Sequence, residues 1–368
     1  MAASALALAS SPVAQITSIG AFVGTERLDV PRCYPGLLEA MNRTVQLGGQ
    51  FAVLEWASWS LANGYIKAWP PQIAVLTNVT RDHLDYHASF GAYLESKGRL
   101  FQAVPRGGFV VLNADDPHAE YLASRVRNGI PILRYSTTDE STPEKQAVRI
   151  ADIRVGWSGT EVTFLLREHL LDPIRIRMIG AHFAENAAAA LTLALGLGLD
   201  PSASARAIGE TPAPPGRFEV VADRPHVVID FAHTANALQR TLDTARSLCK
   251  GRLIAVFGAG GNRDTGKRAS MGRAATRADH IVLTSDNPRF EDPLGIIRDL
   301  RMGIPSAADV EEEPDRAAAI RRAIKRAEGE DVIVIAGRGR DTHQEVGDHW
   351  RPMDDAAIAR DALTGCSG

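Results

Sequence analysis

The sequence predicts an α/β protein built on parallel sheets that are covered by helices. Short β-branched runs alternate with helical stretches along most of the 368 residues, which is the pattern of repeated βαβ units. Residues 148–178 alternate in strand fashion instead and predict a small antiparallel insertion. The proline-rich segment 211–217 is the best candidate linker. We therefore expect two domains, residues 1–210 and 211–368, joined near residues 205–217.

The first half carries three buried apolar runs and two helical segments. The runs are short enough for strands, and the second helical segment ends at glycine, a common C-terminal signal. The predicted strands are 51–56, 73–78 and 109–113, and the predicted helices are 89–104 and 184–198.

The second half repeats the strand–helix alternation. Pro314 and Gly329 fit the N1 and C′ positions of a late helix. The acidic run 311–313 is interpreted as a solvated entry to that helix. The predicted strands are 226–232, 252–258, 280–285 and 331–337, and the other predicted helices are 234–249 and 267–278.

Composition and charge exclude several function classes. The chain is 45% apolar and 23% charged, with a formal net charge of −3, so neither nucleic acid nor a membrane surface is an expected partner. Its apolar N-terminus lacks Lys or Arg before the apolar run, which favours the end of a helix whose start is absent over a signal peptide. Cys33, Cys249 and Cys366 have no metal-type spacing and indicate free thiols in a reducing cytoplasm.

Polar residues gather where the predicted parallel strands end, the place where open α/β sheets bind ligands. Glu55 ends the strand at 51–56, and Lys97 stands alone on an otherwise apolar helix. Such residues could hold a hard divalent cation together with phosphate oxygens. They could equally be helix caps and surface ion pairs, and spacing alone does not decide. The segment after strand 73–78 adds Asp82, His83, Asp85 and His87.

The second half has a glycine-rich turn between a strand and a helix, residues 257–268. Gly261–Lys267 fits GxxxxGK, but Arg268 stands where a Walker A loop needs Ser or Thr for magnesium. Glycines after a strand can also serve tight packing alone, so a true P-loop is disfavoured here. A dehydrogenase is disfavoured as well, because no GxGxxG follows an early strand with an acidic residue about twenty positions on.

Eight motifs in order resemble those of the Mur ligases, over about residues 15–365. Within that family the chain is most similar to the branch that adds the third residue, usually meso-diaminopimelate or lysine, to UDP-N-acetylmuramoyl-L-alanyl-D-glutamate. The motifs are TNVTRDHLDYH with Lys97 downstream, LNADDP, GAHFAEN, PGRFE, DFAHTANAL, FGAGGNRD, SDNPR and AGRGRD.

The resemblance implies a fold and a reaction. The fold is a central ATPase-type domain followed by a Rossmann-like C-terminal domain. ATP would phosphorylate a small-molecule carboxylate, and an amine would attack the acyl phosphate to give an amide, ADP and phosphate. Charge builds on the phosphoryl oxygens in the first step and on a tetrahedral centre in the second. Metal ions and fixed hydrogen-bond donors are the main means of stabilising it. We therefore expect the motifs at 78–97 and 230–264 to face each other across a nucleotide cleft.

The resemblance also assigns residues. Glu55 and His83 match magnesium-binding positions, and Lys97 matches a lysine that reacts with CO2 to form a carbamate able to orient a second Mg²⁺. An arginine in the amine motif suits a carboxylate, by bidentate pairing. The positions around ATP are Asn186, Arg217, Asp230 and His233, and those for the incoming amino acid are Asn287, Arg289 and Asp341.

Departures from the family pattern leave two main hypotheses. The family's P-loop and its first, UDP-binding domain would lie before residue 1, and Trp56, Trp59 and Tyr65 are unusual. The first hypothesis is a ligase for a non-standard substrate, with the P-loop lost to a late start codon or supplied by a separate chain. The second is a pseudoligase that binds nucleotide or substrate. Glu55, His83 and Lys97 together favour the first; the missing loop favours the second.

Overall fold

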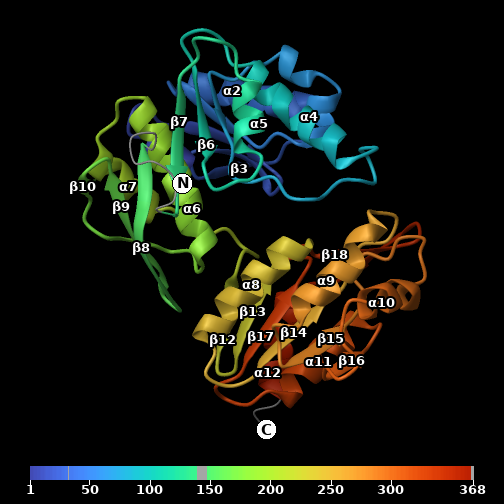
Figure 1. The fold of residues 1–368 in the computed structure, drawn as a ribbon. Coiled ribbons are helices and arrows are strands. Elements are labelled where there is room, and N and C mark those ends of the chain that lie inside the picture. The colour runs from blue at the N-terminus through green and yellow to red at the C-terminus, as the bar shows by residue number, and fades with distance from the viewer. Residues whose placement is uncertain (32, 139–146, 366–368) are drawn as a thin grey trace.

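The protein, seen as a computed structural model, has two lobes (Figure 1). The structure describes residues 1–31, 33–138 and 147–365. Residues 210–218, which contain no helix or strand, connect the two lobes. None of the helices in the described ranges is long and apolar enough to span a bilayer. Cys33 and Cys249 are free thiols, as expected, whereas Cys366 lies outside the described residues.

The first lobe contains two sheets where the sequence predicted one. In the four-stranded sheet the order is β3–β2–β1–β4, and β4 runs parallel to β1. The predicted strand at 51–56 is therefore real but does not join the strands at 73–78 and 109–113. The other three strands were missed because they are only three to five residues long, too short for a clear alternating pattern. The four strands are β1 (Val13–Thr17), β2 (Gly20–Val23), β3 (Glu26–Leu28) and β4 (Phe51–Leu54).

The second sheet of this lobe has seven strands in the order β10–β9–β8–β7–β6–β5, with β11 also paired to β9. The predicted antiparallel segment is confirmed, but it extends the parallel sheet instead of interrupting it, because β8 pairs parallel to the unpredicted β7. The strands are β5 (Ile73–Val75), β6 (Phe109–Asn113), β7 (Ile132–Ser136), β8 (Val148–Gly156), β9 (Gly159–Leu166), β10 (His169–Leu170) and β11 (Ile174–Ile176).

The helices of the first lobe include both that were predicted. In α4, the Ser89 side chain accepts a hydrogen bond from the Ala92 N–H and so caps the helix. In α6, a run of Ala and Leu is fully buried in the main core. The elements are α1 (Ala2–Leu6), α2 (Tyr34–Gln46), α3 (Ser58–Ala62), η1 (Tyr65–Lys67), α4 (Phe90–Gln102), α5 (Ala119–Ser124), α6 (Ala181–Gly196) and α7 (Pro201–Gly209).

The second lobe is a six-stranded sheet with helices on both faces. Its order is β12–β13–β17–β14–β15–β16, and only β12 is antiparallel to its neighbour. The four strands predicted for this half all occur in the sheet. The strands are β12 (Glu219–Asp223), β13 (His226–Asp230), β14 (Leu253–Phe257), β15 (His280–Leu283), β16 (Val310–Glu312) and β17 (Val332–Ala336), and a hairpin of β18 (His343–Val346) and β19 (His349–Pro352) follows.

A separate apolar core covers each face of this sheet. One core contains side chains of α8, α9 and α10 and continues into the first lobe. The other contains side chains of α11 and α12. Figure 1 shows α8 and α9 on the side that faces the first lobe. The elements are α8 (Ala235–Leu248), η3 (Thr265–Lys267), α9 (Arg268–Ala275), α10 (Pro293–Arg301), α11 (Arg316–Arg326) and α12 (Asp355–Gly365).

Two predictions about residues 311–329 were wrong. The first two residues of the acidic run lie in edge strand β16 and the third follows it. The side chains of Glu311 and Glu313 pair with Arg322 of α11. The N-cap of α11 is Asp315, so Pro314 precedes the helix, and the C-cap is Ala327. Asp315 wins the cap position because its carboxylate accepts the Ala318 N–H.

A buried ion pair joins the start of α11 to the start of α12. Arg316 and Asp355 are both fully buried, with Nε–Oδ1 at 2.9 Å and Nη2–Oδ2 at 2.7 Å. The guanidinium also donates to the carbonyls of Ser285 and Ala336 at the ends of two strands. This pair therefore supports the loops that carry two of the predicted substrate motifs.

Replacing Arg316 with Met should strongly destabilise the second lobe. It leaves Asp355 buried without a partner, which typically costs about 3–5 kcal/mol. Urea unfolding followed by circular dichroism measures the effect. Arg322→Met, on the exposed face of the same helix, is the matched control and should leave the midpoint unchanged. Adding Asp355→Leu to Arg316→Met should restore much of the loss. An unshifted midpoint in Arg316→Met alone would contradict this role.

Candidate active site

Glu55 is exposed at the end of β4, and the neighbouring hairpin holds it. Its Oε2 accepts a hydrogen bond of 2.8 Å from the backbone N–H of Ser18, in the turn between β1 and β2. The unpredicted hairpin thus fixes a predicted site residue.

Lys97 lies on α4 with its amine in a partly desolvated position near Glu55. Nζ is 3.4 Å from the carbonyl oxygen of Trp56 and 5.7 Å from the centroid of the Tyr93 ring, one helical turn earlier. Burial lowers the pKa of the Lys97 amine, and the negative charges of Glu55 and Asp82 partly oppose this shift. The structure therefore brings Glu55, Lys97 and Asp82 within electrostatic reach of one another.

His83 sits in the loop after β5 with a left-handed backbone, φ 57°. Such a conformation is uncommon for a residue other than glycine. Three hydrogen bonds hold the turn: Asp82 Oδ1 accepts the His83 N–H at 2.9 Å, and the His83 carbonyl accepts the N–H groups of Tyr86 and His87. The imidazole itself is largely exposed. His87, by contrast, is buried and its Nε2 is 2.9 Å from Ser58 Oγ, so it serves the interior.

Asp82 reaches across to the second lobe. Its carboxylate is 3.5 Å from Lys267 Nζ and 3.7 Å from His233 Nε2. Burial would raise the pKa of the carboxyl, but the His233 contact and the charges of Lys267 and His83 hold it well below its usual range. Asp82 is therefore a charged link between the lobes.

Two flanking ion pairs reinforce this link. Arg81 Nε is 3.6 Å from Asp264, and Arg263 Nη1 is 3.3 Å from Asp85. Together with Asp82 they confirm that the segments 78–97 and 230–264 face each other. We call the contacts of residues 81, 82 and 85 with residues 233, 263, 264 and 267 the interlobe charge cluster.

Asp230 is buried and accepts hydrogen bonds from the linker and from its own lobe. Oδ2 accepts the Phe218 N–H at 2.6 Å, and Oδ1 accepts the Ala232 N–H at 2.8 Å and the Thr241 hydroxyl at 3.1 Å. Burial raises the pKa of this carboxyl, and the three donors oppose the rise. The carboxylate thus anchors the segment beside Arg217, and its predicted contact with ATP stays a prediction.

Arg217 and His233 both lie against the Phe231 ring. The Arg217 guanidinium stacks 4.3 Å from that ring's centroid, and His233 Nδ1 is 2.9 Å from the Phe231 carbonyl oxygen. Burial lowers the pKa of Arg217, while Asp230, Glu55 and Asp341 raise it. Arg217 is therefore within electrostatic reach of Glu55 of the first lobe and of Asp341.

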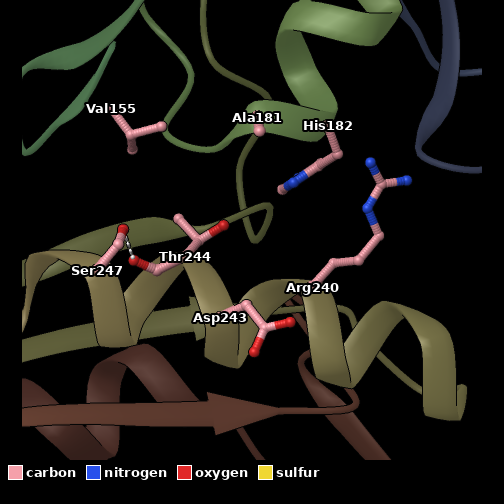
Figure 2. A pocket seen from close by; sticks show the side chains of 7 residues that line it. All are labelled: Val155, Ala181, His182, Arg240, Asp243, Thr244 and Ser247. Atoms are coloured by element: carbon pink, nitrogen blue, oxygen red, sulfur yellow. Dashed lines mark hydrogen bonds between the residues drawn. The ribbon is translucent and has the colours of Figure 1, made fainter. Parts of the chain in front are cut away.

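Asn186 is half-buried in α6, one helical turn after His182, which lines a cleft between the lobes. Its neighbour Glu185 forms an ion pair with Arg240 of α8. In Figure 2 the side chains of His182 and Arg240 lie across this cleft from each other, and burial lowers the pKa of His182 to about 4. The cleft has a volume of about 270 Å³ and contains none of the predicted site residues; its lining is Val155, Ala181, His182, Arg240, Asp243, Thr244 and Ser247.

Two of the predicted amine-binding residues, Asn287 and Arg289, are engaged by other segments of the second lobe. Asn287 Oδ1 accepts hydrogen bonds from Arg338 Nη1 and the Glu345 N–H, at 2.8 and 2.9 Å. Arg289 pairs with Glu345 at 2.5 Å and donates to the Gly261 carbonyl. An incoming carboxylate would therefore have to share or displace Glu345 to reach Arg289.

The glycine-rich turn at 257–268 is a packing turn. A Cβ on Gly261 would meet the Pro288 carbonyl oxygen at 1.9 Å, and one on Gly258 would meet the Thr284 oxygen at 2.3 Å. Arg268 is buried and pairs with Glu291 and Asp299 at 2.8 and 2.9 Å. The residue that breaks the GxxxxGK[ST] pattern thus has a structural role of its own.

Within the described ranges, no three His, Cys, Asp or Glu side chains converge as a ready metal site. Unmodified Lys97 is no ligand for a cation, so the predicted set offers only Glu55 and His83. The set fits a hard cation once Lys97 carries a carboxylate, which adds the missing anionic oxygens.

Sequence analysis missed the roles of Asp82 and Lys267. Asp82 was noted in the polar segment without a role, and Lys267 only as part of the failed P-loop pattern. Both lie in segments that follow parallel strands, β5 and β14, which is the signal that could have found them.

Two family models match the chain: "Mur ligase middle domain" over residues 2–194 and "Mur ligase, glutamate ligase domain" over residues 216–339. The chain is similar to the UDP-N-acetylmuramoyl-L-alanyl-D-glutamate–2,6-diaminopimelate ligase of Solibacter usitatus, with 40% identity over 89% of the chain and 66% of the relative. It is also similar to the ligase of that name from Geobacillus kaustophilus, with 34% identity over 93% of the chain and 72% of the relative. The chain thus spans about two thirds of the length of such relatives.

Solved structures of related ligases resemble this chain over its whole length. A structure of a UDP-N-acetylmuramoyl-L-alanyl-D-glutamate–2,6-diaminopimelate ligase superimposes with a TM-score of 0.66 and 32% identity, covering 100% of this chain and 75% of that one. Mycobacterium tuberculosis folylpolyglutamate synthase, complexed with ADP and AMPPCP, gives a TM-score of 0.73 at 18% identity, covering 100% and 87%. The second likeness shows the shared fold.

The packing role of Arg268 can be tested with Arg268→Ser, which completes the GxxxxGKS pattern. We expect no gain of ATP affinity and a loss of stability of about 2–3 kcal/mol, since charge-assisted hydrogen bonds are lost. Isothermal titration with ATP and urea unfolding measure the two effects, with the exposed Arg263→Ser as the comparison for stability. A gain in ATP affinity without destabilisation would instead make this turn a phosphate loop.

Proposed function

Since the chain belongs to the Mur ligase family, we propose that it is an ATP-dependent ligase that joins an amino acid to a carboxylate through an acyl phosphate. The names of its relatives support UDP-N-acetylmuramoyl-L-alanyl-D-glutamate as the carboxylate and 2,6-diaminopimelate as the amine. They give no support to a non-standard substrate, a pseudoligase or a separate chain that supplies the phosphate loop.

The observation that carries the proposal is the placement of Lys97. Its amine is partly desolvated, faces Glu55 and Asp82, and has a lowered pKa. A larger neutral fraction favours attack on CO2, because only the neutral amine is nucleophilic. The nitrogen forms a bond to carbon, one C–O π bond opens, and a proton leaves to water. The product is a carbamate anion next to Glu55.

Glu55, His83 and the Lys97 carbamate would together hold magnesium. When bound, the metal supplies charge neutralisation for phosphate oxygens. Ser18 fixes the Glu55 carboxylate through its N–H, and Asp82 fixes the backbone of His83. These two contacts keep the proposed ligands oriented before substrates arrive.

Amide formation takes place in two steps. The substrate carboxylate attacks the γ-phosphorus of ATP, and ADP leaves. The amine then attacks the acyl carbon, phosphate leaves with the carboxylate oxygen, and the nitrogen loses a proton. We assign Arg217, His233 and Asn186 to the nucleotide. Asn287, Arg289 and Asp341 are assigned to the incoming amino acid, with Arg289 pairing with its carboxylate.

Lys97 should carry a carbamate in the working protein. In ¹³C-bicarbonate the protein should show a carbamate resonance that Lys97→Met abolishes and Lys67→Met, at an exposed lysine, retains. Amide formation by Lys97→Met should fall roughly 10²- to 10³-fold, the usual effect of losing one electrostatic contributor. A variant with full turnover, or a wild-type protein without the resonance, would refute this role.

A further inference from the structure

One carboxylate in the structure is shared between the lobes and the His83 backbone. Asp82 Oδ1 accepts the His83 N–H at 2.9 Å and lies 3.5 Å from Lys267 Nζ. Asp82 Oδ2 is 3.7 Å from the imidazoles of both His83 and His233. Asp82 therefore contacts the second lobe and the His83 backbone through one carboxylate.

The contacts of Asp82 are less exposed than the pairs around it. The side chains of Asp82 and Lys267 are 18% and 11% exposed, whereas Arg81 is 57% exposed. Water screens exposed pairs so that each contributes little, and desolvated charges interact more strongly. Asp82 with Lys267 is therefore the central pair of the interlobe charge cluster, and the flanking pairs add orientation.

The His83 backbone depends on the same carboxylate. A φ of 57° is disfavoured for any residue that has a Cβ atom. The hydrogen bond from the His83 N–H to Asp82 is one of the contacts that hold the backbone in this conformation. If the lobes separate, Asp82 loses Lys267 and His233 and becomes free to rotate away from the His83 N–H.

We infer that Asp82 is a positioning residue that couples closure of the two lobes to the orientation of His83. Closure brings Lys267 and His233 to the carboxylate, and the fixed carboxylate then holds the His83 loop in its left-handed turn. The effect of the His83 loop on turnover rests on the proposed function, whereas the effect of Asp82 on lobe closure does not.

Closure is measured without substrate, by energy transfer between dyes on Cys33 of the first lobe and Cys249 of the second, in a Cys366→Ser background. Asp82→Asn keeps an acceptor for the His83 N–H but removes the charge, and Lys267→Met removes the partner. Each should lower transfer and weaken its decrease with added salt, and the double variant should be no more open than either single one. Glu168→Gln, at an exposed acidic residue, should behave as wild type.

Turnover measurements then test the coupling of Asp82 to His83 separately from closure. Asp82→Ala should be as open as Asp82→Asn but at least about tenfold slower, because it also loses the His83 contact. The KM for the carboxylate substrate should stay unchanged in both. Unaltered transfer and salt dependence in Asp82→Asn would overturn the closure role, and equal kcat in the two variants would overturn the coupling to His83. A protein that closes as expected but forms no amide would instead disprove the proposed function.

Discussion

The second lobe is organised around the buried carboxylate of Asp230. Its side chain accepts hydrogen bonds from the linker at Phe218 and from Thr241 of α8. Its backbone carbonyl accepts the N–H groups of Gly337 and Gly339, in the loop after β17. A buried charge is costly unless donors surround it, so the segments that supply these donors cannot move independently.

This constraint explains how distant motifs meet. Gly216 packs so closely on the loop after β17 that a Cβ there would lie 2.6 Å from the Arg340 nitrogen. Arg217 follows directly and stacks on Phe231, which places its charge toward Glu55 of the other lobe. The linker is thus part of the candidate site as well as the connection between lobes.

The two lobes meet differently in different places. One apolar core continues from the first lobe into the second, which favours a lasting contact. Near the candidate site they meet through the interlobe charge cluster, whose partly exposed pairs are individually weak and screened by salt. An apolar contact at one end and a charged contact at the other suit a joint that opens and closes at the site.

The sequence predicted the parts of this protein that depend on local pattern. Strands such as β6 and β17 are continuous apolar runs, and Glu55, Asp82 and His233 follow strands, so their convergence could be expected. It could not predict what depends on tertiary contacts. The β1–β2 turn that holds Glu55 has no apolar periodicity, and the three donors that occupy Asp230 come from separate segments.

Activation of a carboxylate as an acyl phosphate between these lobes can be followed by isotope transfer. The protein is supplied with ATP, 2,6-diaminopimelate and UDP-N-acetylmuramoyl-L-alanyl-D-glutamate whose glutamate carboxylates carry ¹⁸O. Mass spectrometry of the released phosphate should find one ¹⁸O atom for each amide formed. Amide formed with phosphate free of ¹⁸O, or ADP released with no amide, would contradict the account.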